Sequence, residues 1–190
     1  MVNRYARPSM ARARDDLGRE PTLSWNESMP KKSAPKTNAM RALDARGIAY
    51  DTFTYPETIH SAEEVATLLG VPASGVYKTL VVLADGERHL LVVTPGDREL
   101  DPRLVARAVG AKSARMAPQR DAERLTGLKV GGISPLALLD KRFEVYVDAT
   151  AQERDTLYIN GGQRGVNLRL RVSDLLAVTG ARFIAATGEP

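Results

Sequence analysis

The sequence predicts an α+β fold in which helices flank a mixed β-sheet. From about residue 37 onward, segments with helix-end signals alternate with short segments rich in β-branched and aromatic residues. At least two pairs of the predicted strands are joined by glycine-containing turns, and such pairs are antiparallel neighbours. Because other strands are separated by helices, the sheet is expected to be mixed and not wholly parallel.

Five helices are predicted from their end signals. Ser61 starts a capping box, and the helix that follows runs to Leu69 and stops at Gly70. Asp101 caps a helix that has proline at its first position and ends at Gly110. The remaining helices are expected at residues 38–46 with Asn38 as the cap, at 118–125, and at 173–179 with Ser173 as the cap.

Seven strands are predicted, and four of them form two hairpins. Residues 78–84 and 88–94 flank the short turn Asp85-Gly86-Glu87. Residues 156–160 and 166–171 flank a glycine-rich segment at 161–165. The other three strands are expected at residues 48–55, 143–147 and 182–185.

Residues 1–36 differ in composition from the rest of the chain. They contain four prolines, mixed charges and no sustained apolar period, which is typical of a disordered arm. We therefore expect a poorly ordered arm at 1–36 and a single domain at 37–190. Met29 would also serve as a start, so part of the arm could be a start-site artefact. The alternative is a basic arm that contacts nucleic-acid phosphates.

The composition argues against several kinds of site. The chain has no cysteine, which excludes disulfides, thiolate metal ligands and a cysteine nucleophile. With only two histidines, a multi-histidine metal centre is not expected. No apolar run has the length of a membrane span, and the arginine-rich N-terminus lacks the apolar core of a secretory signal. A soluble, cytoplasmic protein that does not contact membranes is the expectation.

The formal net charge of +4 arises in the N-terminal arm. Residues 1–38 contain eight Lys and Arg and four Asp and Glu, whereas residues 39–190 contain 19 of each sign. A nucleic-acid surface on the domain would therefore have to be a local patch. The candidates for that patch are Arg103, Arg107, Lys112, Arg115, Arg120 and Arg124. The alternative is that these side chains are solvated helix faces interleaved with acidic residues.

Lys78 is the first candidate for a functional cation. It opens an otherwise apolar strand, where a lysine is costly to desolvate unless its ammonium faces a cleft or a partner. A positioned charge can stabilise charge that develops on a reacting ester. The alternative is a lysine whose head group simply reaches solvent at the strand end. Thr79 beside it could donate its hydroxyl to a sugar or phosphate, or be an ordinary strand residue.

Two glycine-rich segments could present backbone N–H groups to an anion or a carbonyl oxygen, because glycine adds no side chain. They are Gly131-Gly132-Ile133-Ser134-Pro135 and Gly161-Gly162-Gln163-Arg164-Gly165. The alternative for both is an ordinary tight turn. Ser134 is not expected to be a nucleophile, since no Gly-x-Ser-x-Gly elbow surrounds it, and hydrogen bonding is its expected role.

The Lys78-Thr79-Leu80 motif and the two glycine-rich segments, in this order and spacing, resemble the YbaK family. Its members are freestanding aminoacyl-tRNA deacylases related to the editing domain of bacterial prolyl-tRNA synthetases. The resemblance covers about residues 35–186 and implies a curved, barrel-like mixed sheet flanked by helices. It also implies that the protein hydrolyses mischarged tRNA in trans without metal or cofactor. Among the most similar members, the activity is removal of cysteine from tRNA(Pro).

The resemblance also assigns roles to residues. The key lysine of the family falls on Lys78, and the loop that lines the aminoacyl pocket falls on Gly131, Gly132 and Ser134, so these four form the expected catalytic set. Substrate-binding residues are expected at Tyr55, His60, Thr79, Pro135, Asn160, Gly161, Gly162, Arg164 and Asn167. The chain departs from the common family pattern at Asn160, where a serine is frequent, and at Asn167, where an aspartate is often found.

No catalytic nucleophile is evident in the chain, and the resemblance implies a reason. Cysteinyl-tRNA carries its own thiol, which can attack its own ester and release the tRNA as a thiolactone forms. One alternative is an enzyme for alanyl- or seryl-tRNA that activates a water. Another is a non-catalytic module that binds aminoacyl-tRNA or prolyl-tRNA synthetase. The expected partners are the 3′ aminoacyl end and acceptor stem of tRNA and, as a further candidate, prolyl-tRNA synthetase.

Overall fold

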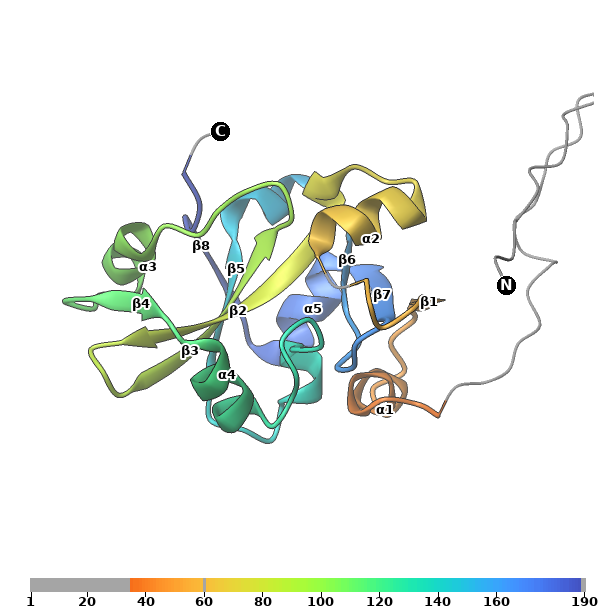
Figure 1. Cartoon of the computed structure of the whole chain (residues 1–190), viewed down its shortest axis with the longest axis horizontal. Helices are drawn as coiled ribbons and strands as arrows, with labels where there is room; N and C mark the ends of the chain where they lie inside the picture. The colour runs from red at the N-terminus through yellow and green to blue at the C-terminus, as the bar shows by residue number, and fades with distance from the viewer. Residues whose placement is uncertain (1–34, 60, 189–190) are drawn as a thin grey trace, which may run out of the picture. The chain divides into compact units, whose positions relative to one another are not determined.

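The computed structural model describes residues 35–59 and 61–188 (Figure 1). Of the predicted arm, residues 1–34 lie outside the described residues, and so does the candidate site residue His60. The described part contains one mixed sheet with helices packed around it, so the predicted α+β fold with a mixed sheet is confirmed.

The sheet has eight strands in the order β1-β7-β6-β2-β3-β5-β8, with β4 paired to β2 off this path. The strands are β1 (Asp51–Thr54), β2 (Val76–Ala84), β3 (Arg88–Pro95), β4 (Ala114–Met116), β5 (Glu144–Asp148), β6 (Thr156–Asn160), β7 (Val166–Arg171) and β8 (Arg182–Ile184). Three pairs are parallel, namely β2 with β6, β3 with β5, and β5 with β8. The other pairs are antiparallel and include both predicted hairpins.

The five helices are α1 (Asn38–Asp44), α2 (Ala62–Leu69), α3 (Pro102–Val109), α4 (Gln119–Thr126) and α5 (Val172–Thr179). The predicted capping box at the start of α2 is confirmed. The Ser61 hydroxyl accepts from the N–H of Glu64, and the Glu64 carboxylate accepts from the N–H of Ser61. The structure corrects two other caps. Thr37, which has an extended backbone, caps α1 in place of Asn38. Helix α5 begins at Val172, so Ser173 lies inside its first turn.

Three short 3-10 helices complete the structure, at Ala73–Gly75 (η1), Pro135–Ala137 (η2) and Ala149–Glu153 (η3). Two of them lie beside the candidate motifs. η1 leads directly into β2 and Lys78, and η2 begins at the last residue of the first glycine-rich segment.

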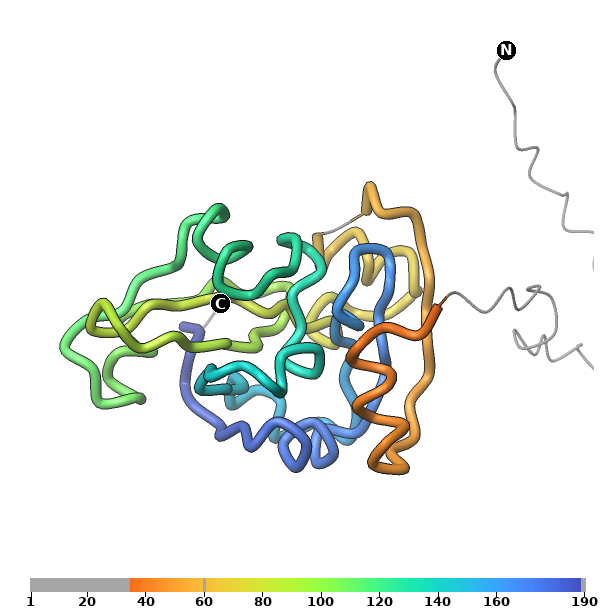
Figure 2. Tube along the Cα trace, turned by 90° about the horizontal axis from the view of Figure 1, so that it is seen from below, coloured from red at the N-terminus to blue at the C-terminus, as the bar shows by residue number. Residues whose placement is uncertain are grey.

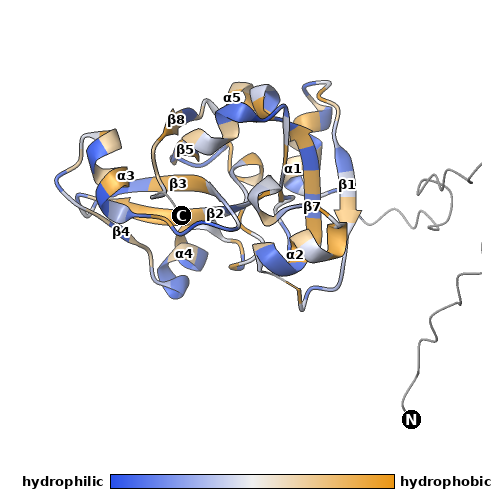
Figure 3. Cartoon of the chain, turned by 90° about the horizontal axis from the view of Figure 1, so that it is seen from above, coloured by the Kyte–Doolittle hydropathy of each residue, from blue (hydrophilic) through white to orange (hydrophobic). Residues whose placement is uncertain are grey.

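The main hydrophobic core lies between the β6–β7 hairpin and the helices α1, α5 and η2. Figure 2 shows α1 running alongside this hairpin, and Leu43, Leu157 and Leu168 are fully buried there. Separate buried clusters lie beneath α3, α4 and α2. Figure 3 shows the hydrophobic character of β2 and β3 at the centre of the domain. This packing fixes β2, which carries Lys78, from both faces.

Candidate active site

The central strand β2 has an open edge at Lys78. On one side it pairs with β3 along almost its whole length. On the other side its first two residues pair with β6 and its last three with β4. Within the described part of the chain, no strand pairs with residues 78–80 on that side. The carbonyl group of Val81 points to this same side of β2 and accepts from the N–H of Ala117 at 2.9 Å. Because these directions alternate along a strand, the N–H and C=O of Thr79 also face the gap.

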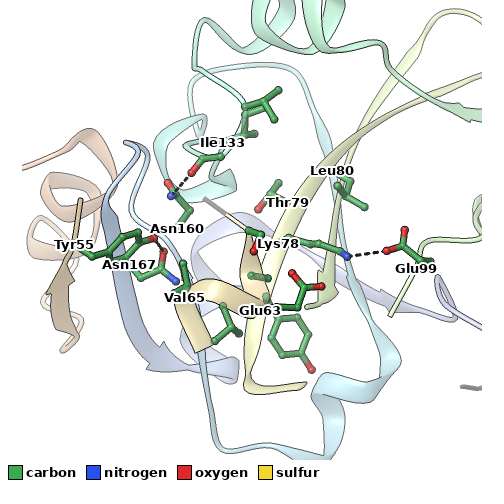
Figure 4. A pocket seen from close by; sticks show the side chains of 16 residues that line it. Tyr55, Glu63, Val65, Lys78, Thr79, Leu80, Glu99, Ile133, Asn160 and Asn167 are labelled. Atoms are coloured by element: carbon green, nitrogen blue, oxygen red, sulfur yellow. Dashed lines mark hydrogen bonds and ion pairs between the residues drawn. The ribbon is translucent and has the colours of Figure 1, made fainter. Parts of the chain in front are cut away.

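A cavity of about 350 Å³ opens at this gap (Figure 4). Its volume is within the range of small-ligand sites. Its walls come from α2 and the segment before it, from β2, from the loop 130–133, and from the ends of β6 and β7. The lining residues are Tyr55, Ser61, Ala62, Glu63, Val65, Val76, Tyr77, Lys78, Thr79, Leu80, Glu99, Val130, Gly131, Ile133, Asn160 and Asn167.

The ammonium of Lys78 is loosely held at one side of the cavity. Its Nζ lies 3.4 Å from the carbonyl oxygen of Gly96 and 3.5 Å from Oε1 of Glu99, and both distances are long for hydrogen bonds. The Lys78 side chain is 25% exposed, whereas Glu99 is 95% exposed. An ion pair with such an exposed partner is weak. Lys78 can therefore donate to an incoming carbonyl, phosphate or alkoxide oxygen.

Tyr55 and Asn167 form the other side of the cavity (Figure 4). The Tyr55 hydroxyl donates to Oδ1 of Asn167 at 2.8 Å, and Asn167 is only 3% exposed. Burial raises the pKa of Tyr55 to about 12, so its hydroxyl keeps its proton at neutral pH. Among the described residues, none accepts a hydrogen bond from Nδ2 of Asn167. That nitrogen is turned away from Tyr55.

Three buried hydroxyl groups have no hydrogen-bond partner in the part of the chain that the structure describes, those of Thr79, Thr94 and Ser134. An unpaired buried polar group costs about 1–3 kcal/mol. Thr79 is a lining residue of the cavity, although its hydroxyl oxygen itself is buried. Thr94 lies opposite Lys78 in the β2–β3 register. Ser134 is fully buried and does not line the cavity.

Asn160 ties the two glycine-rich segments together. Its Nδ2 donates to the carbonyl oxygens of Gly131 at 2.8 Å and Gln163 at 3.1 Å. Its Oδ1 accepts from the N–H of Gly162 at 2.7 Å and of Gln163 at 3.1 Å. All four hydrogen-bonding positions of this amide are thereby used. Asn160 lines the cavity but acts as a brace between its loops.

The two segments also pack backbone against backbone. Arg164 donates from Nε to the carbonyl oxygen of Val130 at 2.7 Å. A Cβ at Gly132 would lie 2.9 Å from the backbone nitrogen of Arg164. Gly162 has φ +87°, and a Cβ there would lie 2.6 Å from the Cβ of Ala137. Glycine is needed at both positions, because a Cβ at Gly132 would push the two segments apart and a Cβ at Gly162 would collide with Ala137 of η2.

Residues 56–178 match the family model of the aminoacyl-tRNA editing domain. The chain belongs to this family. The matched range contains β2 with Lys78 and both glycine-rich segments, so the cavity walls described above are formed mainly by the editing domain.

Relatives of the editing domain include both freestanding proteins and parts of larger enzymes. EbsC of Enterococcus faecalis, named for deacylation of Cys-tRNA(Pro) and Cys-tRNA(Cys), is 34% identical over 83% of this chain and 96% of its own length. A proline–tRNA ligase of Geobacter metallireducens is 34% identical over 57% of this chain but only 18% of the ligase. One solved structure, described as a trans-editing enzyme for prolyl-tRNA synthetase, has 26% identity and a TM-score of 0.70 over 83% of this chain and all of that chain. Another, described only as a hypothetical protein, has 29% identity and a TM-score of 0.74 over 80% of this chain and 99% of that chain.

Six of the predicted site residues line the cavity: Tyr55, Lys78, Thr79, Gly131, Asn160 and Asn167. The others that the structure describes do not line it. These are Gly132, Ser134, Pro135, Gly161, Gly162 and Arg164. Gly132, Gly162 and Arg164 hold the loops in place, and Ser134 and Pro135 are buried behind them.

Sequence reasoning did not single out the two carboxylates of the cavity, Glu63 and Glu99. Glu63 belongs to the first turn of α2, where an acidic residue is common because it complements the helix dipole. The position of Glu63 in the sequence therefore did not indicate a functional role. Glu99 belongs to the loop after β3 and meets Lys78 only in the folded chain.

Among the residues that the structure describes, the ionisable groups that line the cavity are Tyr55, Glu63, Tyr77, Lys78 and Glu99. Over residues 35–59 and 61–188, no group of three or more His, Cys, Asp or Glu is arranged to hold a metal ion. Over the same ranges, no helix has the length and apolar character needed to cross a membrane.

Replacing Asn160 with alanine should loosen both glycine-rich segments. Four hydrogen bonds would be lost, at about 0.5–1.5 kcal/mol each, so we expect the free energy of unfolding to fall by about 2–6 kcal/mol. Denaturant unfolding measures this change. Asn38→Ala is the matched control, because Asn38 is exposed and accepts a single hydrogen bond from Arg41. Equal small losses in both variants would contradict the bracing role.

Proposed function

We propose that this protein removes cysteine from mischarged tRNA(Pro) in trans. The supporting observation is a cavity that holds a weakly paired ammonium, that of Lys78, in an editing domain similar over most of its length to EbsC. Mischarged tRNA would enter with its 3′ end, since the aminoacyl ester is the part of the molecule that fits a cavity of about 350 Å³.

The substrate supplies the nucleophile in this reaction. The cysteine thiol loses its proton to solvent, and the sulfur forms a bond to the ester carbonyl carbon. The bond from that carbon to the ribose oxygen breaks, the oxygen takes up a proton, and tRNA leaves. Water then opens the thiolactone to give free cysteine. Holding the sulfur and the carbonyl in near-attack geometry supplies much of the rate enhancement.

The protein's contribution is to position and polarise the ester. Lys78 is the donor for the oxygen on which negative charge develops. The N–H of Thr79 is a further donor at the open edge of β2, and Gly131 forms part of the opposite wall. We assign Gly132, Ser134, Pro135, Gly161, Gly162 and Arg164 to the support of this wall.

The acceptor stem would extend from the mouth of the cavity onto the protein surface. The basic side chains at Arg103, Arg107, Lys112, Arg115, Arg120 and Arg124 are all exposed and are candidates for contacts with its phosphates. Prolyl-tRNA synthetase is the proposed partner that selects the tRNA, and the cytoplasm is the proposed location. The domain at 37–190 is proposed to act without the arm at 1–36.

Deacylation of a panel of mischarged tRNAs tests the proposal. With Cys-, Ala- and Ser-tRNA(Pro) as substrates, we expect rapid release of cysteine and much slower release of alanine and serine. Preference for alanine or serine would instead indicate an enzyme that activates water. Binding without release of any amino acid would indicate a non-catalytic module.

A further inference from the structure

Asn167 lies at the deep end of the cavity, and Lys78 lies at its mouth. Asn167 is 3% exposed, whereas Glu99, the partner of Lys78, is 95% exposed. Figure 4 shows Tyr55 with Asn167 on one side of the cavity and Lys78 with Glu99 on the other. Since the bulk of a tRNA has to stay outside, the ester belongs near Lys78 and the amino-acid side chain reaches toward Asn167.

The strand register supports this arrangement. Asn167 is paired with Asn160, and Tyr77 is paired with Ile159, so Lys78 is level with Asn160. Side chains at one level of adjacent strands share a face of the sheet. Asn167 and Lys78 therefore lie on one face of the sheet, on opposite sides of β6. Asn160 between them is fully engaged with the loops.

Tyr55 fixes the direction in which the Asn167 amide points. Its hydroxyl donates to Oδ1, which leaves the Nδ2 group as the part of the amide that is free. Across the residues that the structure describes, Nδ2 has no acceptor. The deep end of the cavity thus presents an N–H donor, which pairs with an acceptor or an anion and cannot take up a proton.

We infer that Asn167 is a specificity-determining residue that donates a hydrogen bond from Nδ2 to the sulfur of the cysteinyl substrate and stabilises its thiolate. The inference rests on the proposed function. A hydrogen bond to the charged form lowers the pKa of a group, so a larger fraction of the bound substrate is in the attacking form at neutral pH. Thiol reactivity follows the thiolate fraction.

The test is the pH profile of Cys-tRNA(Pro) deacylation by the full chain and by Asn167→Asp. The wild-type rate should rise with pH to a plateau, with a midpoint below the usual thiol value of about 8.5. In Asn167→Asp the carboxylate still accepts from Tyr55 but repels the thiolate. We expect its midpoint to rise by about one pH unit and its rate at pH 7 to fall about tenfold.

The described part of the cavity lining carries the ionisable groups Tyr55, Glu63, Tyr77, Lys78 and Glu99. These groups are retained in every variant, so their effect on the pH midpoint is the same in the wild type and in each Asn167 variant. Asn167→Leu lacks both donor and charge and should show a smaller rise of the midpoint, and it decides the question if the aspartate variant does not fold. Asn38→Asp adds the same charge outside the cavity and should behave like the wild type.

The outcomes separate the two proposals. If the wild type releases cysteine and the midpoints of all Asn167 variants match its own, Asn167 does not contact the sulfur, while the proposed function stands. If the wild type does not accelerate cysteine release at all, both fail. A shift of the midpoint with cysteinyl substrate, with no pH-dependent effect of Asn167→Asp on seryl-tRNA(Pro), supports the inference.

Discussion

Replacing Lys78 with alanine should lower the rate of Cys-tRNA(Pro) deacylation by about 10²–10³-fold, which is the usual effect of removing one positioned donor from a site where charge develops. The fold should be nearly unaffected. The two contacts of the Lys78 ammonium are long, and the strand is held by its pairing with β3 along almost its whole length. The measurements are single-turnover deacylation and the melting temperature.

Lys141→Ala is the matched control for this prediction. Lys141 is a surface lysine that donates to the backbone carbonyl of Leu125, and it does not line the cavity. Its replacement should leave the rate unchanged. Lys78→Arg should also be slow, because a planar guanidinium does not reproduce a compact ammonium. A Lys78→Ala variant that keeps at least half of the wild-type rate would show that another group polarises the ester.

The helices and strands were largely predictable because their signals are local. The capping box at Ser61, the glycine after each of α2 and α3, and the two hairpins all lie where the sequence analysis predicted them. The caps that were wrong differ by one or two positions. Thr37 and Asn38 are adjacent, and both residue types cap helices well, so sequence alone does not choose between them.

The position of Lys78 in an apolar strand correctly indicated a cleft or a partner, and the structure has both. What the sequence could not give was the relation between segments that are distant along the chain. Asn160 braces Gly131 from 29 positions away. The open edge of β2 exists because β6 pairs only with residues 76 and 77 of β2, whereas β4 pairs only with residues 82–84. The burial of Ser134 was also not predictable. A polar residue beside glycines does not indicate whether its side chain faces the core or the cavity.

The departures from the family pattern at Asn160 and Asn167 have different consequences in the structure. Asn160 uses its whole amide to join the loops, a role that a serine hydroxyl could fill only in part. Asn167 keeps half of its amide free inside the cavity. A carboxylate there would accept hydrogen bonds, whereas the amide donates one. Position 167 is therefore where a change of residue should alter the preference for substrate.

Replacing the thiol of the substrate with a hydroxyl should slow deacylation by at least about 10²-fold. An attacking group held beside its ester has an effective concentration far above that of a competing water. A hydroxyl in the same place does not ionise at neutral pH and reacts poorly. The assay compares Cys- and Ser-tRNA(Pro) prepared on the same transcript, each corrected for spontaneous hydrolysis, so that tRNA binding is constant and only one atom differs.

Lys78→Ala in the same assay separates polarisation of the ester from attack by the thiol. If Lys78 acts on the ester oxygen, its loss should slow both substrates by a similar factor, because both have the same ester. Equal rates for Cys- and Ser-tRNA(Pro) with the wild type would show that the thiol is not the nucleophile. A water would then have to be activated inside the cavity. Glu63, an exposed carboxylate of the lining, would be the first candidate base, and loss of activity in Glu63→Gln with both substrates would identify it.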